Sequence, residues 1–359
     1  MRFLIVRLGA FGDLVHALPV AAALRERFPD SRIDWLVDGR YEALLHLVPA
    51  IDAALVVNAR VGPGARGPST GQGPSERGEP TVTRFAGYRG MPAAIGVLRR
   101  TRYDVAFDLQ GLIKSAVLAR LSGARRVIGF ASGHLREAPA GLFYGERVTP
   151  AAGRHVVHKN MSVLASVGIA AAPLRFPFSD TAGAVVGAIR RDLQVGPTGA
   201  FAALVPGAGW PNKRWPADRF GAAARVLADR WSLPSTVLWG PGEGDRADEV
   251  AARSGGAARR APATTLSDLI EIGRSARLVV AGDSGPLHLA AAAGAPVVAL
   301  LGPTDPARNG PWHPDDESVS RYHECECHYR RRCVRQVPCI DDITVEEVVA
   351  AIERRLSRR

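Results

Sequence analysis

The first half of the chain alternates short apolar runs with longer stretches in which apolar residues recur at helical spacing. Phe3–Arg7 is one such run, and it leads through a glycine-containing turn into Leu14–Phe28, where the helical spacing stops at Pro29-Asp30. A short apolar run bounded by turn residues predicts a buried strand, and the longer period predicts a helix. Further strands are predicted at Ile33–Val37, Ala54–Val57, Val105–Leu109 and Val127–Phe130. This alternation favours an α/β fold with a parallel, doubly wound sheet.

A second alternating series follows Pro173–Asp180, which we interpret as the interdomain linker. Its strands are predicted at Ala202–Val205, Thr236–Trp239, Leu278–Ala281 and Val297–Leu300. Its helices are predicted near Pro216–Trp231, from about Asp245, over Leu266–Ser275 and from about Pro286. Since 359 residues exceed one ordinary domain, we predict two Rossmann-like domains, residues 1–178 and 179–359, facing each other across a cleft. The last predicted helix, Val345–Leu356, is expected to pack back on the first domain.

One segment of the first domain, Val61–Thr83, has no apolar period and is dominated by Gly, Pro, Ser, Arg and Glu. It cannot bury a core, and we expect a flexible surface insertion. Two interpretations remain open: a loop without function, or a flap near an acceptor site.

Composition limits the class of protein. Hydrophobic residues make up 47% and charged residues 23%, which excludes a disordered chain. The apolar runs fall short of the ~20 residues that a membrane-spanning helix needs. No secretory signal is recognised, so we expect a cytoplasmic protein.

The net charge of +11, from 46 basic and 35 acidic residues, favours an anionic partner such as a membrane surface or a phosphorylated substrate. Because only three of the basic residues are lysines, the arginine excess could equally reflect genome composition. No nucleic-acid-binding motif accompanies the charge, and we expect no nucleic-acid partner.

All four cysteines fall in one short window near the end of the chain. Disulfides are not expected in a large cytoplasmic enzyme. Two interpretations remain, a four-ligand zinc site or reduced structural thiols, and the paired C-x2-C spacing that would favour zinc is missing. The residues are Cys325, Cys327, Cys333 and Cys339, with His323 and His328 nearby.

Polar residues follow four of the predicted strands, where parallel sheets bind their ligands. After the first strand, Gly9–Asp13 lacks the middle glycine of a dinucleotide fingerprint, although Asp38 resembles a ribose-binding acid. Asp13 is interpreted either as a helix cap or as a general base. Two further loops carry Lys213, suited to an anionic group or simply solvated, and Glu243, suited to ribose hydroxyls or to helix capping.

The fourth loop gives the strongest signal. A strand ends at Asp283, and Ser284-Gly285 opens a helix whose free N–H groups suit a diphosphate. His288 lies about one turn into this helix, and its side chain either faces the ligand or belongs to the core. No D-x-D occurs, so no metal is expected at the diphosphate. Phosphate-loop and G-x-S-x-G motifs are also absent, which argues against the usual ATPases and α/β-hydrolases.

Taken in order, these segments resemble family 9 glycosyltransferases, the heptosyltransferases of bacterial lipopolysaccharide. The resemblance runs through most of the chain and is strongest for the enzyme that adds the first heptose. The segments that carry it are Gly12-Asp-Leu-Val-His16 with Ala17-Leu-Pro19, Phe107–Ser115, Arg136-Glu137 with Phe143-Tyr144, Lys213-Arg-Trp-Pro216, Trp239-Gly240 with Glu243, Gly282–Gly285 with His288, and Gly302-Pro-Thr-Asp305.

The resemblance implies a GT-B fold, with an N-terminal acceptor domain and a C-terminal donor domain. It implies that Asp13 is the catalytic base of an inverting transfer of heptose from ADP-heptose to a Kdo-lipid A type glycolipid. Lys213 would hold the donor phosphate and sugar, Glu243 the nucleoside and Asp283 the sugar hydroxyls. The amides near Ser284-Gly285 would hold the diphosphate.

The acceptor is the less certain half of this expectation, because Val61–Thr83 and the cysteine-rich segment depart from the best-known first-heptose enzymes. Candidate acceptor-binding residues are Arg7 and Arg136, with Arg99-Arg100 as further basic residues that could face a lipid. A peripheral contact with the inner membrane is expected. The alternative function is a nucleotide-sugar epimerase or an NAD-linked oxidoreductase on a Rossmann-type scaffold.

Overall fold

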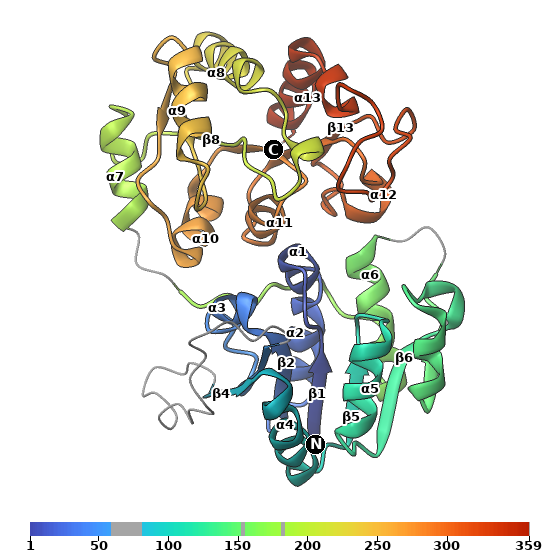
Figure 1. Ribbon diagram of the computed structural model, residues 1–359. Helices are drawn as coiled ribbons and strands as arrows, with labels where there is room; N and C mark the ends of the chain where they lie inside the picture. The colour runs from blue at the N-terminus through green and yellow to red at the C-terminus, as the bar shows by residue number, and fades with distance from the viewer. Residues whose placement is uncertain (59–80, 152–154, 181–183, 359) are drawn as a thin grey trace. The chain divides into compact units, whose positions relative to one another are not determined.

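The computed structural model describes residues 1–58, 81–151, 155–180 and 184–358 (Figure 1). Within these ranges the chain forms two compact units, Met1–Ser179 and Asp180–Arg359, and the division falls at the end of the expected linker. Most of the predicted insertion Val61–Thr83 lies outside the described residues. Its last three residues, however, begin strand β4 (Thr81–Ala86) rather than continuing a loop.

The first unit contains a seven-stranded sheet in the order β4-β3-β2-β1-β5-β6-β7, and every neighbouring pair of strands is parallel. Its central strand β1 is buried along nearly its whole length, as expected for a parallel sheet covered on both faces. Besides β4, the strands are β1 (Arg2–Val6), β2 (Arg32–Asp38), β3 (Ala53–Asn58), β5 (Val105–Asp108), β6 (Arg126–Phe130) and β7 (Glu146–Val148). The α-helices are α1 (Phe11–Val15), α2 (Leu18–Arg27), α3 (Glu42–Leu45), α4 (Gly87–Thr101), α5 (Ile113–Leu121) and α6 (Val156–Met161).

The helix predicted over Leu14–Phe28 is in fact two helices, α1 and α2, separated by His16 and Ala17. Pro19 lies in the first turn of α2, where a missing backbone N–H costs nothing, so the proline starts a new helix. The strands β4 and β7 were not predicted. β7 is only three residues long and only partly buried, which leaves no apolar period to recognise.

The second unit contains a six-stranded parallel sheet in the order β10-β9-β8-β11-β12-β13. The predicted doubly wound α/β architecture is therefore confirmed in both units. The strands are β8 (Ala202–Val205), β9 (Ser235–Val237), β10 (Ala258–Arg260), β11 (Leu278–Gly282), β12 (Val297–Leu301) and β13 (Glu317–Ser320). The α-helices are α7 (Ala184–Asp192), α8 (Ala217–Trp231), α9 (Gly244–Arg253), α10 (Leu266–Ser275), α11 (Gly285–Ala292), α12 (Pro306–Asn309) and α13 (Val345–Ser357).

The apolar face of the last helix, α13, packs within its own unit. Its side chains Val348, Ala351 and Ile352 are fully buried in the core of the second unit, where α13 packs against β12, β13 and α8. The expectation that α13 also packs on the first domain stays a prediction.

Strand order reverses once in each sheet. In the first sheet, β2, β3 and β4 lie on one side of β1, and β5, β6 and β7 lie on its other side. In the second sheet, the reversal lies between β8 and β11. At such a point the loops that follow the two central strands diverge to opposite faces and leave room for a ligand. The loops after β1 and β5, and those after β8 and β11, are therefore the places to look for chemistry.

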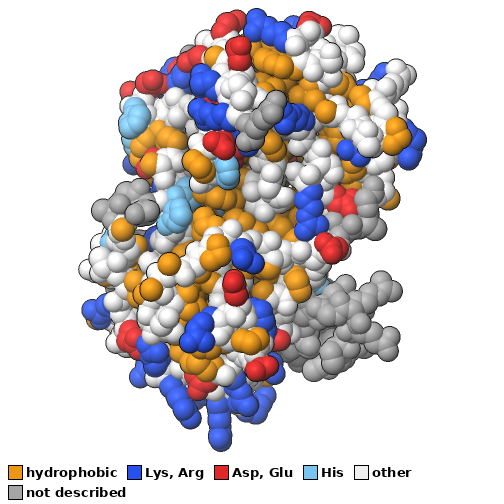
Figure 2. Space-filling view, turned by 180° about the vertical axis from the view of Figure 1, so that it is seen from behind, with side chains coloured by type: hydrophobic (Ala, Val, Ile, Leu, Met, Phe, Trp, Pro, Cys, Tyr) orange, Lys and Arg blue, Asp and Glu red, His pale blue; other side chains and the backbone are white. Residues whose placement is uncertain are grey.

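Basic side chains also gather at the opposite, amino-terminal edge of the first sheet. Lys and Arg project from the lower end of the first unit in Figure 2. A pocket of about 410 Å³ at this edge is lined by Arg2, Arg32 and Arg100, with Val97 and Thr101.

We predict that Gly129→Ala in β6 lowers the free energy of unfolding by ~1–3 kcal/mol, the usual cost of overpacking. A methyl group there would overlap the ring of Tyr144, whose hydroxyl donates a 2.7 Å hydrogen bond to the buried Asp108. The measurement is denaturant unfolding of the whole chain. Gly133→Ala is the matched control, since an added methyl group meets nothing within 4 Å at that position. Equal stabilities of the two variants would contradict this account.

Candidate functional site

Asp13 lies in the short helix α1, directly after strand β1, and its side chain is 10% exposed. Two guanidinium groups contact the same carboxylate oxygen, Oδ2: Arg7 at 2.7 Å and Arg136 at 3.2 Å. The backbone N–H of Ala10 also donates to Oδ2, at 3.3 Å, so part of the helix-cap interpretation holds. The two guanidinium contacts go beyond what a helix cap requires.

Arg7, the last residue before this loop, was expected to contact an acceptor, but its side chain is only 4% exposed. Burial lowers the pKa of its guanidinium, and the neighbouring Asp13 opposes that shift. Arg7 also donates to the carbonyl oxygen of Leu109, which ties the loop after β1 to the loop after β5. In this structure Arg7 positions Asp13 rather than presenting a surface to a bulky ligand.

A second buried carboxylate, Asp108, shapes the loop after β5. Its two oxygens accept hydrogen bonds from the hydroxyls of Ser115 and Tyr144 and from the backbone N–H groups of Gln110 and Gly111. Burial raises the pKa of Asp108, and these donors counteract that shift. Asp108 therefore acts as the internal scaffold of the loop that contacts Arg7.

Arg136 fits its predicted place better than the other basic candidates. Its side chain is 47% exposed while one of its nitrogens reaches Asp13, so it can meet both the carboxylate and a ligand. Arg99 and Arg100 end helix α4, and Arg100 lines the pocket at the amino-terminal edge of the sheet. That edge is opposite to the carboxyl ends of the strands, where Asp13 lies, and the expectation that Arg99-Arg100 face a lipid stays a prediction.

In the second unit, the loops after β8 and β11 bring Lys213 and Asp283 together. The ammonium of Lys213 lies 2.5 Å from Asp283 Oδ2 and 4.4 Å from the centre of the Trp210 ring. Lys213 is partly buried, with 15% of its side chain exposed, so the interpretation of a simply solvated lysine does not hold.

Asp283 receives two further side-chain contacts. The hydroxyl of Thr304 donates to Oδ2 at 2.6 Å, and His288 Nε2 lies 3.1 Å from Oδ1. Burial by itself would raise the pKa of Asp283, but His288 and Lys213 together hold that pKa far below its usual range. Thr304 was not predicted as a site residue. The available signal was its position in Gly302-Pro-Thr-Asp305, which follows the neighbouring strand β12.

Two glycines permit this arrangement. A side chain at Gly282 would place its Cβ 2.5 Å from the carbonyl oxygen of Lys213, and one at Gly207 would overlap the carboxylate of Glu243. Glu243 precedes helix α9, and its Oε2 accepts a 3.0 Å hydrogen bond from the N–H of Gly240. The carboxylate of Glu243 thus lies against the loop that follows β8, in the same half of the chain as Lys213 and Asp283.

Helix α11 begins at Gly285, directly after Asp283 and Ser284, with Pro286 in its first turn. The hydroxyl oxygen of Ser284 is buried, and within the described ranges it makes no hydrogen bond. Buried polar groups are normally satisfied, so a buried hydroxyl beside free helix N–H groups is suited to a bound anion.

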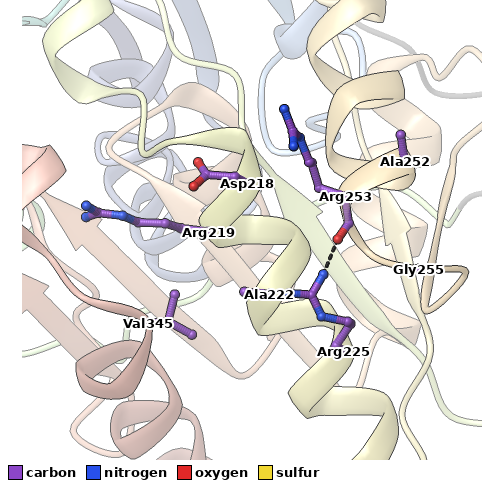
Figure 3. Close-up of a pocket in the computed structure, with 8 residues that line it drawn as sticks. All are labelled: Asp218, Arg219, Ala222, Arg225, Ala252, Arg253, Gly255 and Val345. Carbon is purple, nitrogen blue, oxygen red and sulfur yellow. Dashed lines mark hydrogen bonds between the residues drawn. The ribbon is translucent and has the colours of Figure 1, made fainter.

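A pocket of about 530 Å³ elsewhere in the second unit contains none of the predicted site residues (Figure 3). Arg219 and Arg225 on α8 and Arg253 at the end of α9 contribute its charge, and Arg225 donates to the carbonyl oxygen of Arg253. Because these residues lie on helices rather than after strands, the pocket is distinct from the Lys213–Asp283 cluster. The full lining is Asp218, Arg219, Ala222, Arg225, Ala252, Arg253, Gly255 and Val345.

The four cysteines cluster, with Cys325, Cys327 and Cys339 buried, but the zinc expectation is not supported. Among the residues that the structure describes, no group of three or more His, Cys, Asp or Glu side chains is arranged to hold a metal ion. Cys327 Sγ instead lies 3.3 Å from Cys333 Sγ and accepts a hydrogen bond from the N–H of Val334. Burial raises the pKa of Cys339 to about 12.

Each unit therefore presents a different chemistry after its central strands. The first holds an ionised carboxylate between two guanidinium groups. The second holds an ammonium, a helix N-terminus and a buried hydroxyl, which together suit a diphosphate. No helix within the described parts of the chain is long and apolar enough to cross a membrane.

The chain is similar to several known proteins. Lipopolysaccharide heptosyltransferase 1 of Pseudomonas aeruginosa is 28% identical over 346 residues, which cover 94% of this chain and 88% of the relative. The solved E. coli heptosyltransferase WaaC with ADP-2-deoxy-2-fluoro heptose matches with a TM-score of 0.71 at 22% identity, covering 98% of this chain and 99% of that one. A family 9 glycosyltransferase from Veillonella parvula matches with a TM-score of 0.74 at 20% identity, covering 100% and 98%.

These structural matches confirm the predicted GT-B fold class. The family model described as glycosyltransferase family 9 (heptosyltransferase) matches residues 93–337, which is well over half of the 359 residues. The chain therefore belongs to glycosyltransferase family 9 and is a glycosyltransferase.

Proposed function

We propose that this enzyme transfers heptose from ADP-heptose to a Kdo-lipid A type glycolipid during synthesis of the lipopolysaccharide core. The observation that carries the proposal is the Lys213–Asp283 pair, placed after the two central strands of the second unit. The names of the relatives support the sugar, and one solved relative was determined with an ADP-heptose analogue. The enzyme would act as a peripheral protein at the cytoplasmic face of the inner membrane.

The donor's diphosphate would bind at the start of helix α11. The N–H groups that follow Ser284-Gly285 point along the positive end of the helix dipole, and the buried Ser284 hydroxyl would gain a hydrogen-bond partner. Lys213 would neutralise the phosphate charge that many sugar transferases balance with a metal ion. Its ammonium is held by Asp283, two residues before the start of that helix.

The remaining donor contacts follow from the same loops. Glu243, held against Gly207 and Gly240, would accept hydrogen bonds from the nucleoside. Asp283 would accept hydrogen bonds from the heptose hydroxyls, with His288 and Thr304 keeping its carboxylate ionised and oriented.

Asp13 would act as the general base. The acceptor oxygen would attack the anomeric carbon and pass its proton to Asp13, while the bond from that carbon to the diphosphate oxygen breaks and ADP leaves with the electron pair. Attack from the face opposite to ADP inverts the configuration. Lys213 and the N–H groups of α11 would stabilise the charge that develops on the leaving group.

The two arginine contacts would allow the basicity of Asp13 to change when the acceptor binds. Two adjacent guanidinium groups make a carboxylate a weak base. Arg136 is half exposed, and a carboxylate of the acceptor could draw it away from Asp13, whereas the buried Arg7 would remain. An anionic acceptor would thereby raise the basicity of Asp13 on binding.

Two observations argue against the alternative function, an NAD-linked oxidoreductase. A dinucleotide needs open backbone at the turn after β1, but the ring of Tyr41 lies against Gly9 there. Asp38, which would bind the ribose, instead accepts hydrogen bonds from the backbone and side chain of Arg40.

We predict that Asp13→Asn lowers kcat by roughly 100- to 10,000-fold, the usual contribution of a general base, and leaves donor affinity unchanged. ADP release with a Kdo-bearing lipid A acceptor and calorimetry with ADP-heptose provide the two measurements. The matched control is Asp268→Asn, because Asp268 caps helix α10 from the third position, as Asp13 does in α1. Near-normal turnover in the Asp13 variant would contradict the general-base role and leave Asp13 only its role in capping helix α1.

We predict that Lys213→Ala weakens ADP-heptose binding by roughly 10- to 150-fold, since a hydrogen bond to a charged group contributes about 1.5–3 kcal/mol. Lys213→Arg should recover part of that affinity, because it keeps the positive charge. Lys114→Ala, which removes an exposed lysine from the first unit, serves as control. Equal donor binding by Lys213→Ala and the control would remove Lys213 from the donor site.

We predict that calorimetry with a panel of nucleotide sugars will show ADP-heptose binding more tightly than UDP-, GDP- and TDP-sugars. The expectation rests on a relative, E. coli heptosyltransferase WaaC, which was solved with ADP-2-deoxy-2-fluoro heptose. Preference for another nucleotide would overturn the donor but leave the family and the transfer chemistry in place. Binding of NADH, followed by its fluorescence, would instead favour the oxidoreductase.

A further inference from the structure

Residues 321–339 connect strand β13 to the 3-10 turn η6 (Cys339–Asp342) without forming a helix or strand. Thiols take the place of an apolar core in this segment. Cys325, Cys327 and Cys339 are buried together, and Cys333 packs against them. The N–H groups of Cys327 and Val334 donate to Cys325 Sγ and Cys327 Sγ. We call its outer part, residues 329–337, the arginine tip.

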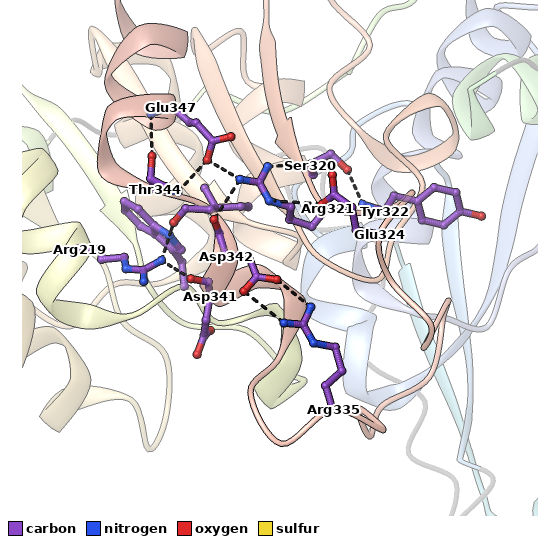
Figure 4. Close-up of polar contacts among 12 residues, drawn as sticks. Arg219, Ser320, Arg321, Tyr322, Glu324, Arg335, Asp341, Asp342, Thr344 and Glu347 are labelled. Atoms are coloured by element: carbon purple, nitrogen blue, oxygen red, sulfur yellow. Dashed lines mark hydrogen bonds and ion pairs between the residues drawn. The ribbon is translucent and has the colours of Figure 1, made fainter.

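Ion pairs fix both ends of the segment to the body of the second unit (Figure 4). At its start, Arg321 contacts Glu347 of helix α13 at 2.5 Å. At its end, Arg335 forms a paired contact with Asp342, at 2.7 and 3.3 Å. The arginine tip is therefore carried on a frame held at both ends.

The arginine tip is also tied to the donor loops of the same unit. The side chain of Asn212, next to Lys213, donates a 2.9 Å hydrogen bond to the carbonyl oxygen of Arg330. The N–H of Tyr329 donates to the carbonyl oxygen of Pro303, one residue before Thr304. Whatever the tip contacts is therefore held near the donor loops.

Basic side chains dominate the surface of the tip. Arg330, Arg331 and Arg332 are consecutive and exposed, and none forms an ion pair with another described residue. From Cys327 to Ile340 the sequence contains no acidic residue. The nearest acids before it are Glu324, which pairs with Arg321, and Glu326.

Two apolar side chains accompany these arginines. Val334 is 64% exposed and Val337 is 52% exposed, which makes them two of the few large apolar side chains that the described surface exposes. Tyr329, at the start of the tip, is 41% exposed. The tip thus combines three cationic side chains with apolar ones on a fixed support.

We propose that the arginine tip is a docking surface for an anionic phospholipid bilayer, with the arginines at the headgroups and Val334 and Val337 at the acyl boundary. Each basic residue near an anionic membrane contributes about 1 kcal/mol, and shallow apolar insertion adds to it. The inference rests on the proposed function, because only a lipid-linked acceptor requires this enzyme to meet a membrane.

The apolar residues favour a membrane over nucleic acid. Protein surfaces that hold single strands use aromatic rings on which bases stack, and a β-branched valine offers no such face. Tyr329 does not provide one either, because the guanidinium of Arg308 lies 5.5 Å from its ring centre and its hydroxyl accepts from the N–H of Asp305.

The test is flotation of the whole protein with vesicles of about two parts phosphatidylcholine to one part phosphatidylglycerol, against pure phosphatidylcholine. We expect binding to the anionic vesicles alone, with release near ~1 M salt, where the screening length falls to about 3 Å. The triple variant Arg330→Ser, Arg331→Ser, Arg332→Ser should bind roughly a hundredfold more weakly. Val334→Ser with Val337→Ser should weaken binding without changing its salt dependence.

The control is a triple variant with the same loss of charge elsewhere, Arg27→Ser, Arg120→Ser and Arg125→Ser, at exposed positions of the first unit. Equal flotation of the tip variant and this control would overturn the proposal, as would binding to both kinds of vesicle. A gel shift with generic DNA that the tip variant abolishes, without vesicle binding, would assign the tip to nucleic acid instead.

Turnover separates this inference from the proposed function. With a deacylated, water-soluble acceptor the tip variant should match the unchanged protein, and with acceptor embedded in anionic vesicles it should be slower. Heptose transfer in solution without vesicle binding would overturn the docking surface alone. Vesicle binding through the tip without heptose transfer to any acceptor would overturn the proposed function and leave the membrane contact standing.

Discussion

A buried carboxylate has to be compensated, and at the donor end of this enzyme that requirement falls on Asp283. Its side chain is 8% exposed at the end of a central strand, and an uncompensated charge there would cost several kcal/mol. Three partners come from segments that follow three adjacent strands: Lys213 after β8, His288 in helix α11 after β11, and Thr304 after β12. The pairing of one anion thus ties together the loops that would bind the donor.

The first unit meets the same requirement with different residues. Asp13 follows its central strand and is compensated by Arg7 and Arg136, one buried and the other half exposed. The chemical outcome differs because the partners differ. One lysine balances Asp283 beside the N-terminus of α11, whereas the carboxylate of Asp13 lies between two arginines, so its strength as a base would depend on those neighbours.

The sequence was sufficient to predict the parts of this arrangement that are local. Strands at Ala202–Val205 and Leu278–Ala281, and the polar residues after them, could be read from apolar runs that end in turn residues. It could not show that Thr304 contacts Asp283, because that contact depends on β12 lying beside β11, and strand order is a property of the assembled sheet.

Other differences between the predictions from sequence and the structure also have specific physical causes. Arg7 looks like a surface cation in sequence, yet the neighbouring strand supplies the Leu109 carbonyl that allows it to be buried. Helix α13 has an apolar face that any partner could cover, and only the fold of its own unit decides which one does. The cysteine spacing suits a metal or free thiols, and a preference for one emerges only from the contacts of each sulfur atom.

The support beneath Lys213 has a consequence for how a ligand would meet it. The turn that carries this lysine rests against Gly282 and Gly302, and its side chain is already held by a carboxylate and an indole ring. A flexible lysine carries about 2 kcal/mol of rotamer entropy, and here most of that freedom is lost when the protein folds. An arriving anion would therefore exchange one partner of a fixed ammonium for another, and its affinity would measure the difference between two ionic contacts rather than the strength of a new one.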